Sequence, residues 1–442
     1  MDSTAATRPG AGVPVVELAA MLARLGELTD TADPVEGDTA VDAARIDAIG
    51  LLERIQAAAA ATQAALSVRF ARSQVARQQQ QVLRDPRSVG RGIGDQLALA
   101  CRVSPSEGSR RLGIARALHD ELPATARLLR DGRISFCVAG LVVSETRHLD
   151  PDRRRAVDTR IAAALPGCAP RQAAALARRY AYAADPQGYV NRGRTARTDR
   201  RVSIRPAPGT MSLLTGYLPV EQGVACWAAL RAHTDTLKNG GDPRTRDQIM
   251  ADTLIERITG QARAHDVQAE VAIVIPASAL THPASPGYAA HPDGEPGQVA
   301  EVLGHGPLPM PLATEILAQS QGRKWWRRLF TAPHGGITGG DPTRRCFDGT
   351  LATLIGYRDG GRCREPFCDA PARHTDHIVA HRDGGLTTFG NGRATCVRSN
   401  QVREMPGWQV RLVHDGGGKH PHTVLTVTPT GHSYTSRAGP AP

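Results

Sequence analysis

The stretch from residue 363 to residue 408 constrains the fold of this chain most, because it concentrates cysteine, histidine and turn residues. It reads CREPFCDAPARHTDHIVAHRDGGLTTFGNGRATCVRSNQVREMPGW. Cys363 and Cys368 are separated by four residues, and Cys396 follows twenty-eight residues after Cys368. This spacing is typical of two facing knuckles whose thiolates hold a structural zinc ion in a tetrahedral site. The sequence therefore predicts a compact, cysteine-bound module near its C-terminal end.

The predicted zinc site lacks its fourth thiolate. Ser399 stands where a second Cys-x-x-Cys pair would end, and a serine hydroxyl is a poor zinc ligand because it stays protonated near neutral pH. His374, His381, Cys346 or water then completes the site, or the three cysteines pack in a knuckle without metal. The sequence leaves both alternatives open.

Four residues in the same region carry a second kind of chemistry. Asp376 and His377 are adjacent, Asn391 follows His377 by fourteen residues, and Asn400 follows it by twenty-three. A neutral imidazole can deprotonate water near physiological pH. A carboxylate and an amide oxygen are hard ligands suited to Mg²⁺, and such an ion neutralises charge on a phosphate under attack. The joint spacing therefore indicates phosphodiester cleavage.

These residues resemble the HNH endonucleases, whose site is a ββα-metal fold of two strands, a loop and a helix. The resemblance implies that His377 is the general base and that Asp376 and Asn400 hold a catalytic Mg²⁺ or Mn²⁺ ion. It also implies that Asn391 braces the loop that aims His377. Arg403 stands where the family usually has lysine, and it is expected to contact a nucleic-acid phosphate.

The resemblance extends to a subgroup of HNH proteins from high-GC bacteria with a long helical N-terminal domain of unknown function. The stretches LHDELPATARLLRDGRISFCVAGLVVSETRHL and TRRCFDGTLATLIGYRDG resemble that subgroup. The similarity covers roughly residues 40–435, and its motifs are specific at the C-terminal end and diffuse in the helical part.

The whole sequence predicts a mainly α protein whose large helical domain, with a small β portion, precedes a C-terminal ββα-metal (HNH) module. Apolar residues recur at helical spacing for some forty residues from about residue 41, and alternating residues around Pro208-Gly209 predict a hairpin. The predicted parts are an N-terminal tail (1–37), a helical domain (38–280) with a hairpin near 200–218, a Pro/Gly-rich linker (281–345), the nuclease module (346–413), and a terminal hairpin and tail (414–442).

The charge balance favours a polyanionic partner. Lysine and arginine exceed aspartate and glutamate by 54 − 43 = 11, which suits DNA. The N-terminus has no basic start followed by a long apolar run, so we expect no signal peptide. No stretch is long and apolar enough to predict a membrane span, and we expect a cytoplasmic protein. The sequence gives no signal for an oligomeric state.

Three possibilities for the function remain open. One makes the helical region the functional part and gives the C-terminal module only a structural role; the other two assign a function to the module itself. The first is a metal-dependent DNA endonuclease, supported by the set of Asp376, His377, Asn391 and Asn400. The second is a catalytically inactive HNH-like protein that binds nucleic acid while its helical domain recruits a partner. Ser399 is the feature that favours the second function.

Overall fold

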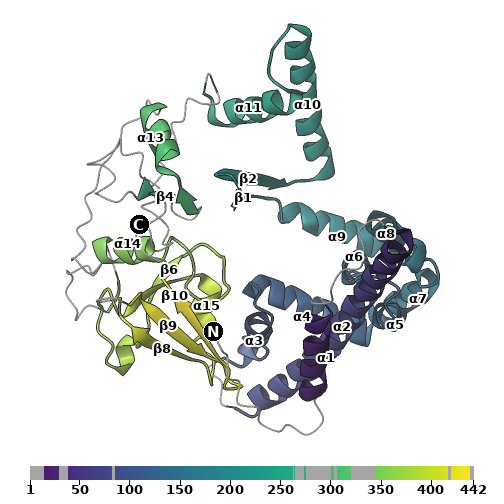
Figure 1. Cartoon of the computed structure of the whole chain (residues 1–442), viewed down its shortest axis with the longest axis horizontal. Helices are drawn as coiled ribbons and strands as arrows, with labels where there is room; N and C mark the ends of the chain where they lie inside the picture. The colour runs from purple at the N-terminus through teal and green to yellow at the C-terminus, as the bar shows by residue number, and fades with distance from the viewer. Residues whose placement is uncertain are drawn as a thin grey trace. The chain divides into compact units, whose positions relative to one another are not determined.

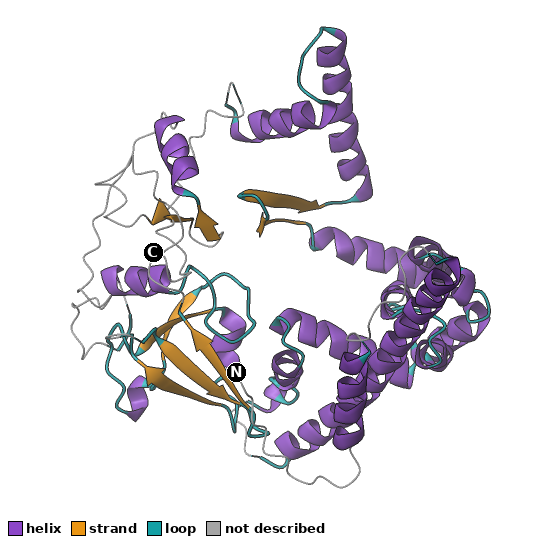
Figure 2. Cartoon of the chain, in the orientation of Figure 1, coloured by secondary structure: helices purple, strands orange, loops and turns teal. Residues whose placement is uncertain are grey.

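The computed structural model describes residues 14–28, 38–81, 85–261, 263, 273–274, 300–302, 306–319, 345–347, 349–416 and 420–438. Over these residues the chain is mainly helical (Figure 1), and its strands form small antiparallel sheets (Figure 2). The chain divides into two compact units. The first contains residues 1–80 and 110–186, and the second contains residues 81–109 and 187–442. Helix α4 (Pro105–Asp120) contributes residues to both units.

The described part of the first unit is built from helices. Leu122, Leu129, Val142 and Ile161 lie at the centre of its core, each almost fully buried. The helices are α1 (Val15–Glu27), α2 (Thr39–Gln79), α5 (Pro123–Arg130), α6 (Phe136–Glu145), α7 (Pro151–Ile161) and α8 (Pro170–Ala184), with a 3-10 helix at Leu165–Gly167. Helices α6 and α7 both pack against α8, and α5 packs against α2.

Side-chain caps explain where several of these helices begin. Ser135 caps α6 and Asp150 caps α7, each accepting a hydrogen bond from a backbone N–H that has no partner within its helix. Asp158 plays this part for a neighbouring helix, because its buried carboxylate accepts bonds from the backbone N–H groups of Ala124 and Thr125 at the start of α5. Burial raises the pKa of Asp158, although these hydrogen bonds oppose the shift.

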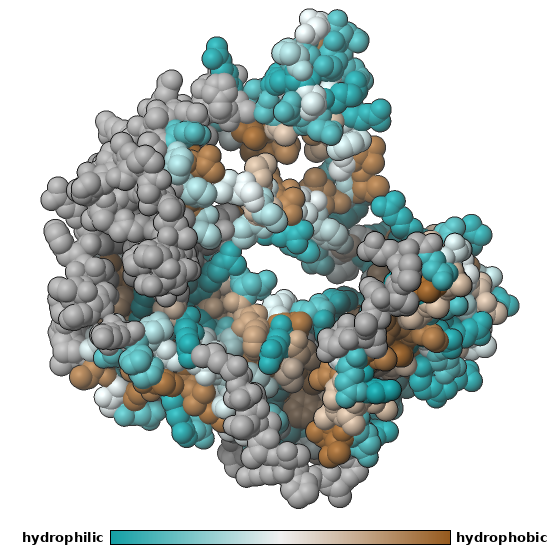
Figure 3. Space-filling view, viewed as in Figure 1, coloured by the Kyte–Doolittle hydropathy of each residue, from teal (hydrophilic) through white to brown (hydrophobic). Residues whose placement is uncertain are grey.

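The middle of the second unit contains a hairpin and two long helices. Strand β1 (Arg201–Ala207) pairs antiparallel with β2 (Met211–Tyr217), which is the hairpin expected near residues 200–218. Many apolar side chains here are exposed, including that of Trp227. Figure 3 shows brown, hydrophobic patches over this part of the chain. The other elements are α9 (Pro186–Thr198), α10 (Val220–Asn239), α11 (Arg246–Thr259), β3 (Ile273–Val274), β4 (Ala300–Val302), β5 (Gly306–Leu308) and α13 (Met310–Gln319).

The C-terminal part of the second unit contains two small sheets. Strands β6 (His374–His377) and β7 (Gly392–Thr395) form an antiparallel pair, and helix α15 (Val397–Val402) follows directly. Strands β8 (Gln409–His414), β9 (Thr423–Val427) and β10 (Ser433–Arg437) form a three-stranded sheet in the order β10-β9-β8. Helix α14 (Gly349–Arg358) and a 3-10 helix at His381–Asp383 complete this part. Helix α3 (Ile93–Ala100), preceded by a 3-10 helix at Pro86–Ser88, belongs to the same unit.

The structure agrees with the prediction of a mainly helical chain with small antiparallel sheets toward the C-terminal end. The range 38–280, predicted as one helical domain, contributes to both compact units. The hairpin predicted over 414–442 is part of a three-stranded sheet that begins at Gln409. Most of the linker predicted over 281–345 lies outside the described residues. Over the described ranges, the structure contains no helix of the length and apolarity that crossing a membrane requires.

Candidate active site and cysteine cluster

Strands β6 and β7 form the frame of the candidate active site. Their register places His377 opposite Gly392 and Asp376 opposite Arg393. Gly392 is needed for close packing, because a Cβ at this position would collide with Ile355 and lie 2.9 Å from the Phe347 ring. Helix α14, which carries Ile355, therefore packs directly against the strand pair.

The His377 imidazole is held on two sides. Its Nε2 lies 2.8 Å from Thr387 Oγ1, and its ring centroid lies 4.3 Å from that of Phe347. Burial lowers the pKa of His377, and the Asp376 carboxylate opposes the shift only in part. The side chain is therefore neutral near pH 7, and no described residue forms a hydrogen bond with Nδ1. A neutral imidazole with one nitrogen anchored and the other available is what a general base requires.

Asn391 fastens the loop that connects β6 to β7. Its Oδ1 accepts a bond from Val379 N at 2.8 Å, and its Nδ2 donates to Val379 O at 3.0 Å and to Leu386 O at 2.8 Å. Its backbone oxygen accepts a bond from Ile378 N at 2.8 Å. The buried Asn391 side chain thus holds the backbone that follows His377, which is the geometry of a bracing residue.

Arg403 lies against Asp376 instead of extending into solvent. Its Nη1 donates to Asp376 Oδ2 and to the backbone oxygen of His377, and its Nη2 donates to Ile378 O at 3.0 Å. Arg393 is fully buried on the neighbouring strand, with Nε 3.7 Å from Asp376 Oδ2. The Asp376 carboxylate therefore has two cationic neighbours.

Asn400 lies on helix α15, which packs against the strand that carries Asp376. Asn400 and Arg403 are three residues apart, so they share one face of the helix, and α15 packs against β6. The half-buried Asn400 side chain forms no hydrogen bond with any residue that the structure describes, which leaves its amide oxygen available. A carboxylate at Asp376 and an amide oxygen at Asn400 are the hard donors that Mg²⁺ or Mn²⁺ prefers.

Three cysteine sulfurs gather into a cluster that could hold a metal ion. The Sγ atoms of Cys363, Cys368 and Cys396 all lie within 4.8 Å of one another, and those of Cys368 and Cys396 are 4.0 Å apart. Ser399 Oγ lies 3.3 Å from Cys363 Sγ and 3.2 Å from Cys396 Sγ. The buried Ser399 hydroxyl therefore lies beside the thiols, at the position where a fourth cysteine would complete the cluster.

The other predicted zinc ligands do not join this cluster. His374, His381 and Cys346 are exposed, and none belongs to a group of described residues close enough to share an ion. Hydrogen bonds from its two neighbouring thiols lower the pKa of Cys396, whereas the thiol of Cys363 raises the pKa of Cys368. A bound cation would favour the thiolate forms of these cysteines.

An open hollow of about 420 Å³ lies beside the cysteine cluster. Phe367 contributes to its wall with a φ of 61°, a conformation that a bulky side chain rarely adopts. The buried carboxylate of Asp359 pairs with Arg358 and Arg364 and neutralises part of the positive charge of the hollow. Arg437 is exposed and forms no ion pair with a described residue. The guanidinium groups of the hollow come from Arg358, Arg362, Arg364 and Arg437.

Three residues of the candidate site were not predicted from the sequence. Thr387 and Phe347 contact the His377 ring from loops, and nothing in their spacing indicates this. Arg393 lies on β7, whose four residues are all buried, so no alternation of polar and apolar residues marks the strand. Only the position of Arg393 opposite Asp376 in the register could have indicated its role.

The fold and the site together describe a helical protein with a strand pair and a helix beside a cysteine cluster. A family model described as a domain of unknown function, DUF222, matches residues 49–381. The match covers more than half of the chain, which therefore belongs to the DUF222 family. This family is commonly associated with HNH endonuclease proteins, but the matched range ends before Asn391 and Asn400. No curated protein and no solved structure matches the chain.

Proposed function

We propose that this protein is a metal-dependent HNH endonuclease that hydrolyses phosphodiester bonds of DNA in the cytoplasm. The observation that carries the proposal is the environment of His377. Its imidazole is buried and neutral, Thr387 anchors Nε2, and the same strand carries Asp376. The adjacent helix α15 supplies Asn400. A base and two hard oxygen donors therefore come from elements that pack against one another.

In the proposed reaction, His377 takes a proton from water at Nδ1 while Thr387 holds Nε2 and keeps the ring in place. Asp376 and Asn400 would hold Mg²⁺ or Mn²⁺, which when bound neutralises charge that develops on the phosphate. Asn391 keeps the backbone beyond His377 in position. Arg403, already bonded to Asp376, adds positive charge next to the site.

The cysteine cluster has a separate, structural role in this proposal. Thiolates are soft ligands that select zinc, and Cys363, Cys368 and Cys396 would hold Zn²⁺ with three protein ligands. The hydroxyl of Ser399 fills the remaining space as a poor ligand. We therefore expect weak zinc binding, with the candidate catalytic site intact beside it.

Plasmid cleavage tests the proposed activity. Purified protein and its His377→Ala variant are incubated with supercoiled plasmid and Mg²⁺ or Mn²⁺. Loss of a general base typically lowers the rate by about 10²–10⁴-fold, whereas DNA binding should change little. His374→Ala is the matched control, because it removes an exposed imidazole from the same strand. Equal cleavage by wild type and His377→Ala would remove the general-base role.

The alternative is a nucleic-acid-binding protein without cleavage. Two observations favour it. Arg403 already donates a hydrogen bond to the Asp376 carboxylate and so competes with a metal ion for it. The hollow beside the cysteine cluster is lined with arginines, which suit phosphate. In that case wild type and His377→Ala should both leave the plasmid intact. Salt-dependent DNA binding should remain, because phosphate contacts release condensed counterions.

A further inference from the structure

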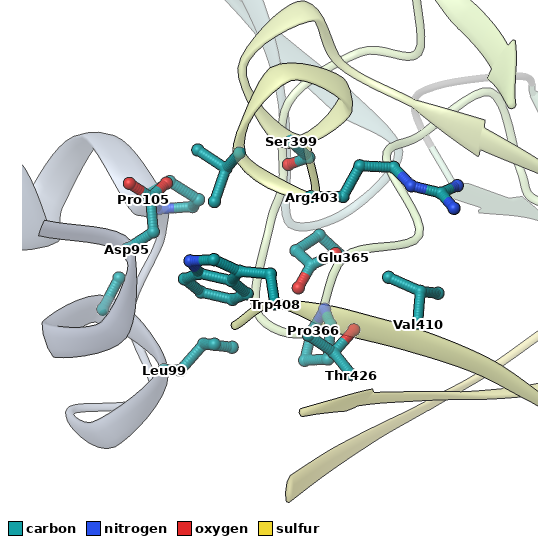
Figure 4. A pocket seen from close by; sticks show the side chains of 12 residues that line it. Asp95, Leu99, Pro105, Glu365, Pro366, Ser399, Arg403, Trp408, Val410 and Thr426 are labelled. Atoms are coloured by element: carbon teal, nitrogen blue, oxygen red, sulfur yellow. The ribbon is translucent and has the colours of Figure 1, made fainter. Parts of the chain in front are cut away.

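A short helix from the N-terminal half of the chain packs on the C-terminal module. Leu99 of α3 is buried together with Val402, Met405 and Trp408. Figure 4 shows Leu99 and Asp95 on one side of this contact and Trp408 between them and the C-terminal strands. The space left among these side chains is only about 10 Å³, which is room for roughly one water molecule. The contact is therefore closely packed.

A charge-assisted pair fixes this contact at helix α15. Arg398 donates from Nε to Asp95 Oδ1 at 2.6 Å and from Nη2 to Asp95 Oδ2 at 2.8 Å. The same Nη2 also donates to Ser109 Oγ at 2.7 Å. Two-pronged bonds between arginine and a carboxylate are both strong and directional. Because Asp95 is 7 % exposed, removing its partner would leave a buried carboxylate without compensation.

Glycines allow α3 and the start of α4 to approach each other closely enough for this arrangement. A Cβ on Gly94 would lie 2.6 Å from Ser109 Oγ, and a Cβ on Gly108 would collide with Gly94 O. The crossing therefore holds Ser109 at the place where it meets Arg398.

Helix α15 is too short to hold its own position. It has six residues, whereas isolated helices need about 12–15 residues to be even marginally stable in water. Arg398, near its start, is bound to Asp95, and Arg403, at its end, is bound to Asp376. Asn400 lies between these two anchors, so each anchor helps to set its position.

We infer that residues 85–109 are an integral part of the catalytic module and that Asp95 is a positioning residue, which through Arg398 sets the place of Asn400 relative to Asp376. The catalytic half of this inference rests on the proposed function. The other half, that α3 holds α15 in place, does not depend on any activity.

Hydrogen exchange in the full chain tests the structural half. The variants are Asp95→Asn, Arg398→Ala and their combination. Removing one partner of a charged hydrogen-bonded pair should lower the protection of the amides of residues 400–403 by about 10–100-fold. The double variant should lose little more, because both changes break the same contact. Unchanged protection in Asp95→Asn would overturn the inference, whether or not the protein cleaves DNA.

Asp252→Asn is the matched control, because Asp252 also accepts a short bond from an arginine, Arg244 Nη1 at 2.6 Å. That pair lies at α11, outside the contact of α3 with α15, and its loss should leave protection of α15 unchanged. An equal loss of α15 protection in Asp252→Asn would show a general loosening of the unit and would overturn the specific role of Asp95.

The Mn²⁺ dependence of plasmid cleavage tests the catalytic half. Outer partners of metal ligands typically affect metal affinity by about 10–100-fold, so Asp95→Asn should raise the half-saturating Mn²⁺ concentration about tenfold. Saturating Mn²⁺ should largely restore the rate, and Asp95→Glu should show a smaller shift. A purely structural role would lower the amount of folded protein and leave the half-saturating concentration unchanged. If the wild type cleaves and Asp95→Asn has the same half-saturating Mn²⁺ concentration, the positioning role is wrong. If the wild type does not cleave, the proposed function fails, and hydrogen exchange alone decides the structural half of the inference.

Discussion

Replacing Ser399 by cysteine would add the thiolate that the cysteine cluster lacks. In a tetrahedral site with zinc–sulfur bonds of about 2.3 Å, neighbouring sulfurs are about 3.8 Å apart. Cys368 Sγ and Cys396 Sγ are already 4.0 Å apart, and Ser399 Oγ lies 3.2 Å from Cys396 Sγ. A thiolate at position 399 therefore needs only a small outward adjustment to complete the tetrahedron.

The size of the effect follows from the role of a direct ligand. Losing even an outer partner of a metal ligand typically costs about 10–100-fold in affinity. A fourth thiolate should therefore tighten zinc binding at least about 100-fold, which corresponds to about 2.7 kcal/mol. With zinc in excess, the same free energy stabilises the folded module, and its melting temperature should rise by roughly 10–20 °C.

Zinc content after dialysis against a chelator, followed by thermal unfolding with and without added zinc, measures this prediction. Ser399→Ala should show no gain, and Ser212→Cys controls for a thiol added outside the cluster, on the exposed hairpin strand β2. One tightly held zinc per wild-type chain would refute the reasoning, because the site would then be complete without a thiolate at residue 399.

Protonation and surface charge give three further tests. Burial lowers the pKa of His422 to about 4, and unfolded histidine titrates near about 6.5. The free energy of unfolding of the C-terminal module should therefore be highest above about pH 6.5 and fall by about 1.4 kcal/mol per pH unit down to about pH 4. Urea unfolding at a series of pH values measures this, and His422→Gln should remove this pH dependence. Cleavage needs neutral His377, whose pKa is lowered, so the acidic limb of the pH–rate profile should have its midpoint below about pH 6.5, and a midpoint above pH 7 contradicts the assignment. Arg437→Ala should reduce the slope of log affinity for DNA against log salt by about 0.9, with Arg411→Ala, outside the hollow, as control.

Local chemistry made part of this structure predictable. The cysteine spacing predicted the cluster. Cys363 and Cys368 lie before the strand pair of β6 and β7, and Cys396 lies directly after it, so the antiparallel pairing brings the three thiols together. The hairpin was predictable from the alternation around Pro208-Gly209. Helix starts such as Ser135 and Asp150 carry caps that can be recognised in the sequence.

Long-range contacts were not predictable in the same way. Asp95 and Arg398 are 303 positions apart, and neither residue belongs to a motif. The contact of Thr387 with His377 depends on the course of a loop, which no periodic pattern describes. Strand β10 was missed because its sequence, SYTSR, has no run of apolar β-branched residues, and it is recognised only by its pairing with β9.

The size of the candidate site explains why its parts come from so much of the chain. Strands β6 and β7 have four residues each and α15 has six, and a two-stranded pair of this kind is at best marginally stable alone. It must therefore be supported by other elements, and the structure provides α14 against the strands and α3 against α15. The DUF222 match runs from residue 49 through β6 to residue 381, so the family domain includes both α3 and the strand that carries His377. Helix α3 and the candidate site are thus parts of the same compact unit, and removing residues 85–109 would remove a supporting face of the site itself.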